Sequence, residues 1–204
     1  MNRILIPTIG LTLLLLYSCS NPKEDEQYED TDNIDTMYEI DYNPDYENAH
    51  PKAKELMNED FFYSSTNETA PFGSDDAADT YAGFAEWRVA NKFANPKVFL
   101  IQHIEDWGYP DFDLATTDFE KLKSYLQTSE MHIYYLTSID QSILAIAFGQ
   151  LYIEGKIDDE MLLIAKYSLE RQLNSQILKT WPSDYQEERK LKLTKMDIVI
   201  SELK

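Results

Sequence analysis

Three carboxylates lie close together in the first turns of one predicted helix, and they are the strongest candidates in this chain for binding or catalysis. Asp75, Asp76 and Asp79, here called the acidic turn, follow Ser74, and Asp75 and Asp79 share one helical face. Several carboxylate oxygens at close range could hold Ca²⁺, Mg²⁺ or a cationic partner. In the structural interpretation, which we favour, Ser74 caps the helix and the first two carboxylates stabilise its positively charged end. That interpretation leaves Asp79 unexplained and makes Arg88 its expected ion-pair partner.

A second acidic segment begins like a calcium-binding loop but does not continue as one. Asp111 and Asp113 have the spacing of the first two ligands. Ala115 and Thr116 stand where a third oxygen ligand and the turn glycine should be. The sequence therefore excludes an EF-hand at this position.

The remaining residue types that carry chemistry lack the neighbours that their chemistry requires. His50, His103 and His132 have no companion at a metal-ligand spacing, and His103 is expected to be a partly buried core residue. The sequence has no nucleophile elbow, phosphate-binding loop or dinucleotide fingerprint. We therefore expect a protein that is not an enzyme and has no cofactor. The alternative is a hydrolase or divalent-cation-binding protein that uses the acidic turn.

The only cysteine follows directly on the apolar N-terminal segment. Arg3 precedes an apolar run from residue 4 to residue 16, which is the layout of a secretory signal peptide. The run is shorter than the roughly 20 apolar residues that a membrane-spanning helix needs. Residues 16–19, Leu-Tyr-Ser-Cys, resemble the lipobox of bacterial lipoproteins. The resemblance implies removal of residues 1–18 and a lipid on Cys19, whose acyl chains would anchor the protein to a membrane.

Residues 19–50 have the composition of a disordered acidic tether. Between residues 20 and 50, eleven acidic side chains stand against one basic side chain, Lys23. So acidic a segment with few aliphatic residues is expected to stay disordered and extended. Residues 35–37, Asp-Thr-Met, resemble a sequon for O-glycosylation, which makes Thr36 a candidate site. Residues 23–26, Lys-Glu-Asp-Glu, resemble an export signal of outer-membrane lipoproteins, and both surface display and a periplasmic orientation stay open.

The overall charge and the cysteine count exclude several classes of function. The chain has 37 acidic and 18 basic residues, a formal net charge of -19. Such a charge repels nucleic acids, whereas it suits a basic protein partner. A single cysteine allows neither an intramolecular disulfide nor a thiolate metal cluster.

Residues 51–204 predict one all-α domain, a compact bundle of about seven helices, because no stretch shows sustained strand alternation. The first helix is expected at Pro51, the second from Ser74 to about Lys92, and the third from Asn95. Capping boxes are expected at residues 117–120 and 183–186.

The central helix is predicted at residues 139–154, which are apolar on almost every face. A helix capped by Asp158 follows it, and the last helix has an inner stripe of Leu193, Met196 and Ile200. Residues 131–136 are prone to form a short strand.

The order of several features resembles a family of small helical bacterial proteins of unknown function. Residues 72–79, Phe-Gly-Ser-Asp-Asp-Ala-Ala-Asp, are similar to the acidic motif of that family. An alanine-rich helix, a helix with Leu169 and Arg171, then Trp181 and a last helix with Arg189 follow in similar order. The resemblance implies a protein-binding module, of which an immunity protein against a toxin is one form. We therefore expect a membrane-anchored lipoprotein with a non-catalytic, protein-binding helical domain.

Overall fold

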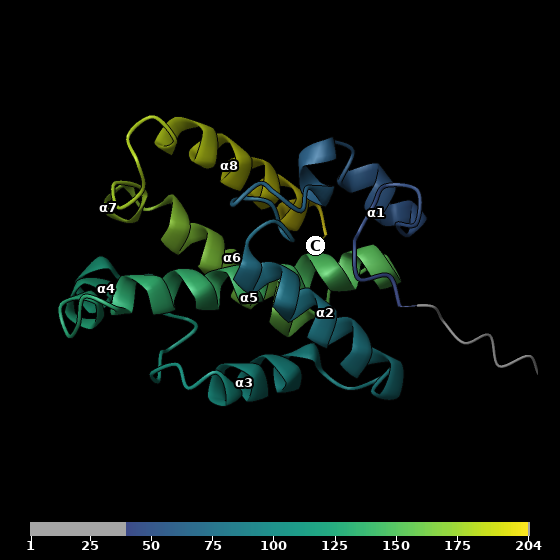
Figure 1. Cartoon of the computed structure of the whole chain (residues 1–204), viewed down its shortest axis with the longest axis horizontal. Helices are drawn as coiled ribbons and strands as arrows, with labels where there is room; N and C mark the ends of the chain where they lie inside the picture. The colour runs from purple at the N-terminus through teal and green to yellow at the C-terminus, as the bar shows by residue number, and fades with distance from the viewer. Residues whose placement is uncertain (1–39, 204) are drawn as a thin grey trace, which may run out of the picture. The chain divides into compact units, whose positions relative to one another are not determined.

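The all-α prediction is confirmed. A computed structural model describes residues 40–203, and in this range it contains eight α-helices, one 3-10 helix and no strand (Figure 1). The elements, in chain order, are α1 (Pro51–Leu56), η1 (Asp60–Tyr63), α2 (Asp75–Ala90), α3 (Pro96–Asp106), α4 (Phe119–Leu126), α5 (His132–Glu154), α6 (Asp159–Leu173), α7 (Ser175–Leu178) and α8 (Gln186–Glu202). None of these helices combines the length and the apolar character that crossing a membrane requires.

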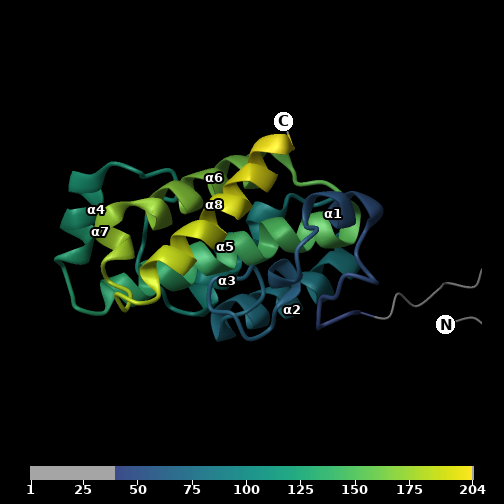
Figure 2. The ribbon, with the colours of Figure 1, turned by 90° about the horizontal axis from the view of Figure 1, so that it is seen from above.

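Helix α5 is the central element, as its apolar sequence predicts. Every side chain from residue 139 to residue 152 is buried. Helices α2 and α6 pack directly on α5, and α8 packs on α6 (Figures 1 and 2). The helix ends where Gly155 adopts a left-handed conformation with φ of +69°, which glycine adopts without steric cost.

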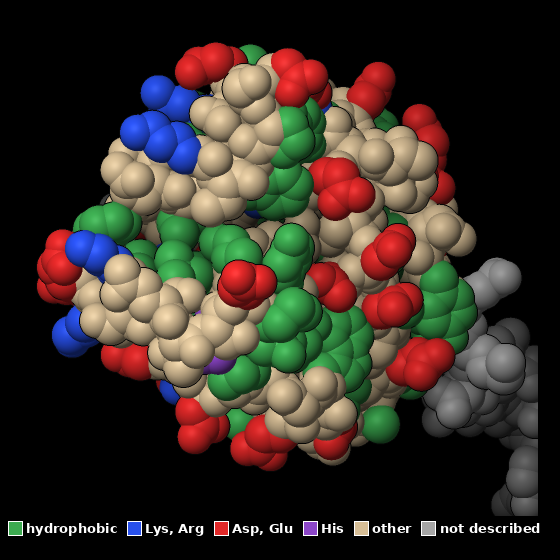
Figure 3. All heavy atoms as spheres, turned by 60° about the vertical axis from the view of Figure 1, so that its left-hand side comes forward, with side chains coloured by type: hydrophobic (Ala, Val, Ile, Leu, Met, Phe, Trp, Pro, Cys, Tyr) green, Lys and Arg blue, Asp and Glu red, His purple; other side chains and the backbone are tan. Residues whose placement is uncertain are grey.

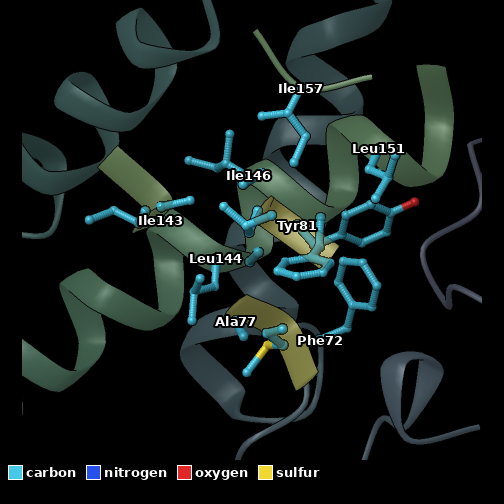
Figure 4. Close-up of a cluster of buried hydrophobic side chains, with 14 of the residues drawn as sticks. Phe72, Ala77, Tyr81, Ile143, Leu144, Ile146, Leu151 and Ile157 are labelled. Carbon is cyan, nitrogen blue, oxygen red and sulfur yellow. The ribbon is translucent and has the colours of Figure 1, made fainter. Parts of the chain in front are cut away.

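The hydrophobic core forms where α2 crosses α5. Figure 4 shows Phe72, Tyr81 and Leu151 grouped around this crossing. The two helices approach closely because residue 149 is glycine, since a Cβ there would lie 2.8 Å from Cδ2 of Tyr81. Burial of each large apolar side chain contributes about 1.5 to 3 kcal/mol to the free energy of unfolding. The core thus fixes α2, which carries the acidic turn, against the most buried helix.

The folded domain begins earlier than the expected boundary at Pro51. Residues 40–50, here called the N-terminal strap, lie on α2 and α5. Tyr81 donates a hydrogen bond to the carbonyl of Asp41 at 2.9 Å, and Tyr152 donates to its carboxylate at 2.6 Å. The acidic composition indicated disorder, but two buried tyrosines supply donors for Asp41. The rest of the expected tether lies outside the described residues.

Three local expectations are corrected. Asp118, not Thr117, caps α4, because its carboxylate accepts from the backbone N–H groups of Glu120 and Lys121 at 2.9 and 3.1 Å. At α8, the side chain of Gln186 donates to the carbonyl of Trp181 at 2.7 Å instead of completing a capping box.

Residues 131–136 are not a strand, since α5 already begins at His132. Ile133 and Leu136 are three positions apart, and both pack against Leu122 in a second hydrophobic cluster. A helix brings residues at this spacing onto one face, whereas a strand does not.

A buried ion pair connects the irregular segment before α4 to the core. Arg171 on α6 donates from Nε to Oδ1 of Asp140 on α5 at 3.0 Å, and both side chains are almost completely buried. The Nη1 atom of Arg171 donates to the carbonyls of Leu114 and Thr116 at 2.7 and 3.1 Å. Because the guanidinium satisfies backbone groups of the segment and a carboxylate of the core, it holds the two together.

Candidate interaction surface

The acidic turn forms the N-terminus of α2 in the way the structural interpretation predicts. The Ser74 hydroxyl accepts from the backbone N–H of Ala77 at 3.1 Å. Asp75 and Asp79 are exposed, whereas Asp76 is partly buried and accepts a hydrogen bond from the hydroxyl of Ser138 on α5. The three carboxylates thus have different surroundings. Within residues 40–203, no group of three or more acidic, histidine or cysteine side chains could hold a metal ion.

The expected ion pair between Asp79 and Arg88 is wrong. Arg88 pairs with Glu154 at the end of α5, donating from Nη2 to Oε2 at 3.1 Å, and only 6% of its side chain is exposed. Arg88 is nine positions after Asp79, which places the two about 180° apart around the helix axis. Asp79 therefore has no cationic partner in the part of the chain that the structure covers.

His103 on α3 is partly buried against α2, in agreement with the expectation of a partly buried core residue. Its Nε2 atom is 2.9 Å from Oγ1 of Thr80, which is also 2.9 Å from the hydroxyl of Ser142. Because Thr80 donates its own proton to the carbonyl of Asp76 at 2.6 Å, its oxygen accepts from both neighbours. This pattern assigns the proton of the neutral imidazole to Nε2. Burial lowers the pKa of His103, and the nearby carboxylates of Asp106, Asp76 and Asp79 oppose that shift.

The other two histidines have structural contacts. The Nδ1 atom of His50 accepts from the backbone N–H of Lys52 at 3.1 Å and caps α1. The Nδ1 atom of His132 lies 2.7 Å from the carbonyl of Tyr125. The carboxylate of Asp113 stabilises its own turn by accepting from Ala115 and Thr116 at 3.1 and 2.8 Å.

A continuous row of aromatic rings runs beside the acidic turn. It starts in the core at Phe84 and passes along α3, the following loop, α5 and α4, with each ring centroid at most 6.2 Å from the next. All of its members except Phe84 are partly exposed. In spatial order this aromatic row is Phe84, Trp87, Phe99, His103, Trp107, Tyr109, Tyr135, His132, Tyr125 and Phe112.

Carboxylates border the middle of this row. The acidic aromatic face, as we call it, consists of the rings of Phe99, His103, Trp107, Tyr109 and Tyr135 with the carboxylates of Asp76, Asp79 and Asp106. Figure 3 shows one side of the molecule on which hydrophobic side chains form a continuous area bordered by acidic ones. Like Asp79, Asp106 is exposed and pairs with no cation that lies within the described range. Aromatic faces beside unpaired carboxylates form a surface that attracts cations.

None of the hydroxyl groups near this face is paired with a histidine in a way that would make it a catalytic nucleophile. Thr80 contacts His103 but is completely buried and uses its proton on a backbone carbonyl. Ser138 donates to Asp76, and no serine hydroxyl between residues 40 and 203 hydrogen-bonds to an imidazole. The arrangement therefore lacks the serine–histidine contact that hydrolases of the triad type require.

A groove of about 960 Å³ lies where the N-terminal strap crosses α2 and α5. Its lining includes Tyr42, Tyr152, Arg88 and Glu154. These groups already bind one another or their neighbours, since Tyr42 donates to Glu86 at 2.9 Å and Arg88 pairs with Glu154. Because its polar groups are engaged, we consider the groove a weaker candidate than the acidic aromatic face.

Two predicted sites, Cys19 and Thr36, lie outside the described residues, and their modification stays a prediction. Comparison with known proteins adds no relationship, because no family model, curated protein or solved structure matches this chain. The resemblance to a small helical family therefore also stays a prediction.

Proposed function

We propose that this protein is a membrane-anchored bacterial lipoprotein whose helical domain binds a basic segment of another protein through the acidic aromatic face. The observation that carries the proposal is the position of exposed, unpaired Asp79 and Asp106 beside the ring row of His103 and Trp107. The anchor rests on the lipobox-like residues that end at Cys19. No catalytic step is part of this function.

The chemistry of the face selects a cationic partner. A lysine or arginine side chain that lies on Trp107 gains a cation–π attraction, and its charged end can pair with Asp106 or Asp79. Tryptophan and tyrosine also carry a large share of the binding energy in protein interfaces. The net charge of -19 accelerates the approach of such a partner from a distance.

A partner of this kind fits the expected location. A lipid on Cys19 would hold the domain at the outer membrane, either on the surface or in the periplasm, where it could meet secreted or envelope proteins. A basic toxin domain is one such partner, and in that case the protein would act as an immunity protein.

The anchor is tested by replacing the residue that would carry the lipid. We expect metabolic labelling with an alkyne fatty acid to mark the full chain and to leave the Cys19→Ala variant unlabelled and extractable without detergent. Labelling of the Cys19→Ala variant would show that another residue carries the lipid.

The face is tested by cross-linking in the producing cells. A photo-reactive amino acid replaces Tyr109 on the face or, as a control, the exposed residue Glu187 on α8. We expect the Tyr109 position alone to capture a partner, through a basic segment, and an arginine-rich peptide to compete with the capture. Equal capture from both positions, or capture through an acidic or neutral segment, would contradict the proposal.

A further inference from the structure

One buried arginine of the core forms no direct ion pair with a carboxylate in the described part of the chain. Arg189 on α8 is 2% exposed, and its Nη1 atom donates to the hydroxyl of Thr69 at 3.1 Å. Its Nη2 atom donates to the side-chain oxygen of Gln172 on α6, which packs beside α8 (Figure 2). No carboxylate between residues 40 and 203 forms an ion pair with it.

Two hydrogen-bond donors at this place are buried without an acceptor. They are Nε of Arg189 and Nε2 of Gln172, which is itself only 3% exposed. The neighbouring Arg171 does not share this deficit, since Asp140 neutralises it. A buried cation and buried donors are costly unless an acceptor satisfies them. Burial lowers the pKa of Arg189 to about 10, whereas Tyr185, Asp140 and Glu68 oppose that shift.

The indole ring of Trp181 covers the guanidinium. It lies 3.8 Å from Cζ of Arg189 and belongs to the loop between α7 and α8, and it is partly exposed. Stacking on an aromatic face partly compensates a buried cation but gives no acceptor to a donor in the guanidinium plane. Because a loop residue forms the cover, a small ligand could enter when the loop moves.

We propose that Arg189 and Gln172 form a binding site for a small carboxylate beneath Trp181. A carboxylate only accepts hydrogen bonds, and its charge would pair directly with the buried guanidinium. One oxygen would accept from Nε of Arg189 and the other from the amide of Gln172. Because both donors are buried, formate, the smallest carboxylate, is the ligand we test.

The first test is thermal unfolding of the full chain in sodium formate and in sodium chloride at equal ionic strength. We expect formate to raise the melting temperature, by about 5 to 10 °C at a concentration 100 times its Kd. The melting temperature in sodium sulfate of equal ionic strength should be no higher than in sodium chloride. Equal melting temperatures in formate and chloride would mean that water satisfies the donors, and the proposal would be wrong.

Two variants assign the effect to this site. Gln172→Glu places a carboxylate beside Arg189 without changing the side-chain size, so it should raise the melting temperature in chloride and remove the formate response. Lys190→Gln removes a charge from the exposed neighbour of Arg189 and should keep the full response. A formate response that persists in Gln172→Glu, or that Lys190→Gln abolishes, would overturn the proposal even if Arg189 variants fail to fold.

Discussion

The imidazole of His103 and the indole of Trp107 lie 4.1 Å apart between ring centroids, one helical turn from each other at the end of α3. His103 also contacts Thr80 on α2, so the rings of α3 are fixed to the helix that carries the acidic turn. The two helices thereby bring aromatic rings and carboxylates into one surface. This relationship is the structural basis of the proposed binding function.

The burial of the His103 imidazole leads us to expect that the stability of the protein depends on pH. Burial lowers its pKa below the ordinary value of about 6.5, so in acid the unfolded chain takes up a proton that the folded imidazole resists. The stability from this residue is present above pH 6.5 and is lost as the pH falls through the folded pKa. We expect His103→Gln to make the free energy of unfolding less dependent on pH between 7 and 5, as measured by urea denaturation. His50→Asn, at an exposed histidine that caps α1, should keep the dependence of the parent. If both variants reduced the pH dependence of the free energy of unfolding equally, His103 would not be its source.

The N-terminal strap predicts where the chain can be shortened. A chain that starts at residue 40 should be as stable as the full chain. A chain that starts at Pro51 loses Asp41, the acceptor for Tyr81 and Tyr152, and should lose roughly 2 kcal/mol or more of its free energy of unfolding. Thermal and urea denaturation of the two chains measure this difference, and equal stability would show that the strap contributes nothing.

The buried pair of Arg171 and Asp140 predicts a large effect on stability. Asp140→Ala leaves the guanidinium buried without its counter-charge and should cost about 3 to 5 kcal/mol in the free energy of unfolding. Replacing both residues, as in Asp140→Leu with Arg171→Met, should cost less than the single change. Lys97→Gln, which removes an exposed ion pair with Glu160, is the control and should cost under about 1 kcal/mol. A single change at Asp140 that costs no more than this control would contradict the structural role.

Local sequence signals predicted the helices well, and their failures have physical reasons. Ser74, Pro96 and Gly155 act within one turn of their own position, so the ends of α2, α3 and α5 could be located. The order of the N-terminal strap was not predicted, because Tyr81 and Tyr152, which bind Asp41, are 40 and 111 residues away from it in the sequence.

Only part of the acidic aromatic face could be predicted from the sequence. Asp76 and Asp79 are close along the chain, whereas Asp106 and the rings come from other helices and a loop. Only the packing of α3 and α5 shows that Trp107 and Tyr135 belong to one row. The pairing of Arg88 with Glu154 was equally hidden, although counting turns between Asp79 and Arg88 would have excluded the expected pair.

Asp79 distinguishes a binding surface from a metal site. Asp79→Asn should change the free energy of unfolding by less than about 0.5 kcal/mol, because the side chain is exposed and unpaired. It should slow association with a peptide of alternating arginine and serine residues, whereas Glu187→Gln on α8 should slow it less. Millimolar calcium should shift the melting temperature of the parent no more than magnesium does. A calcium-specific shift that Asp79→Asn removes would make the acidic turn a cation site.

The most direct test of the proposed function is the affinity of Trp107→Ala for the same arginine–serine peptide, measured by calorimetry beside the parent. Circular dichroism first establishes that the variant is folded. Because an aromatic residue at the centre of an interface carries much of the binding energy, the Kd should rise at least about tenfold. Leu191→Ala, at an exposed apolar residue of α8, should leave the Kd unchanged. If the folded Trp107→Ala variant binds the peptide as tightly as the parent, the acidic aromatic face is not the binding surface.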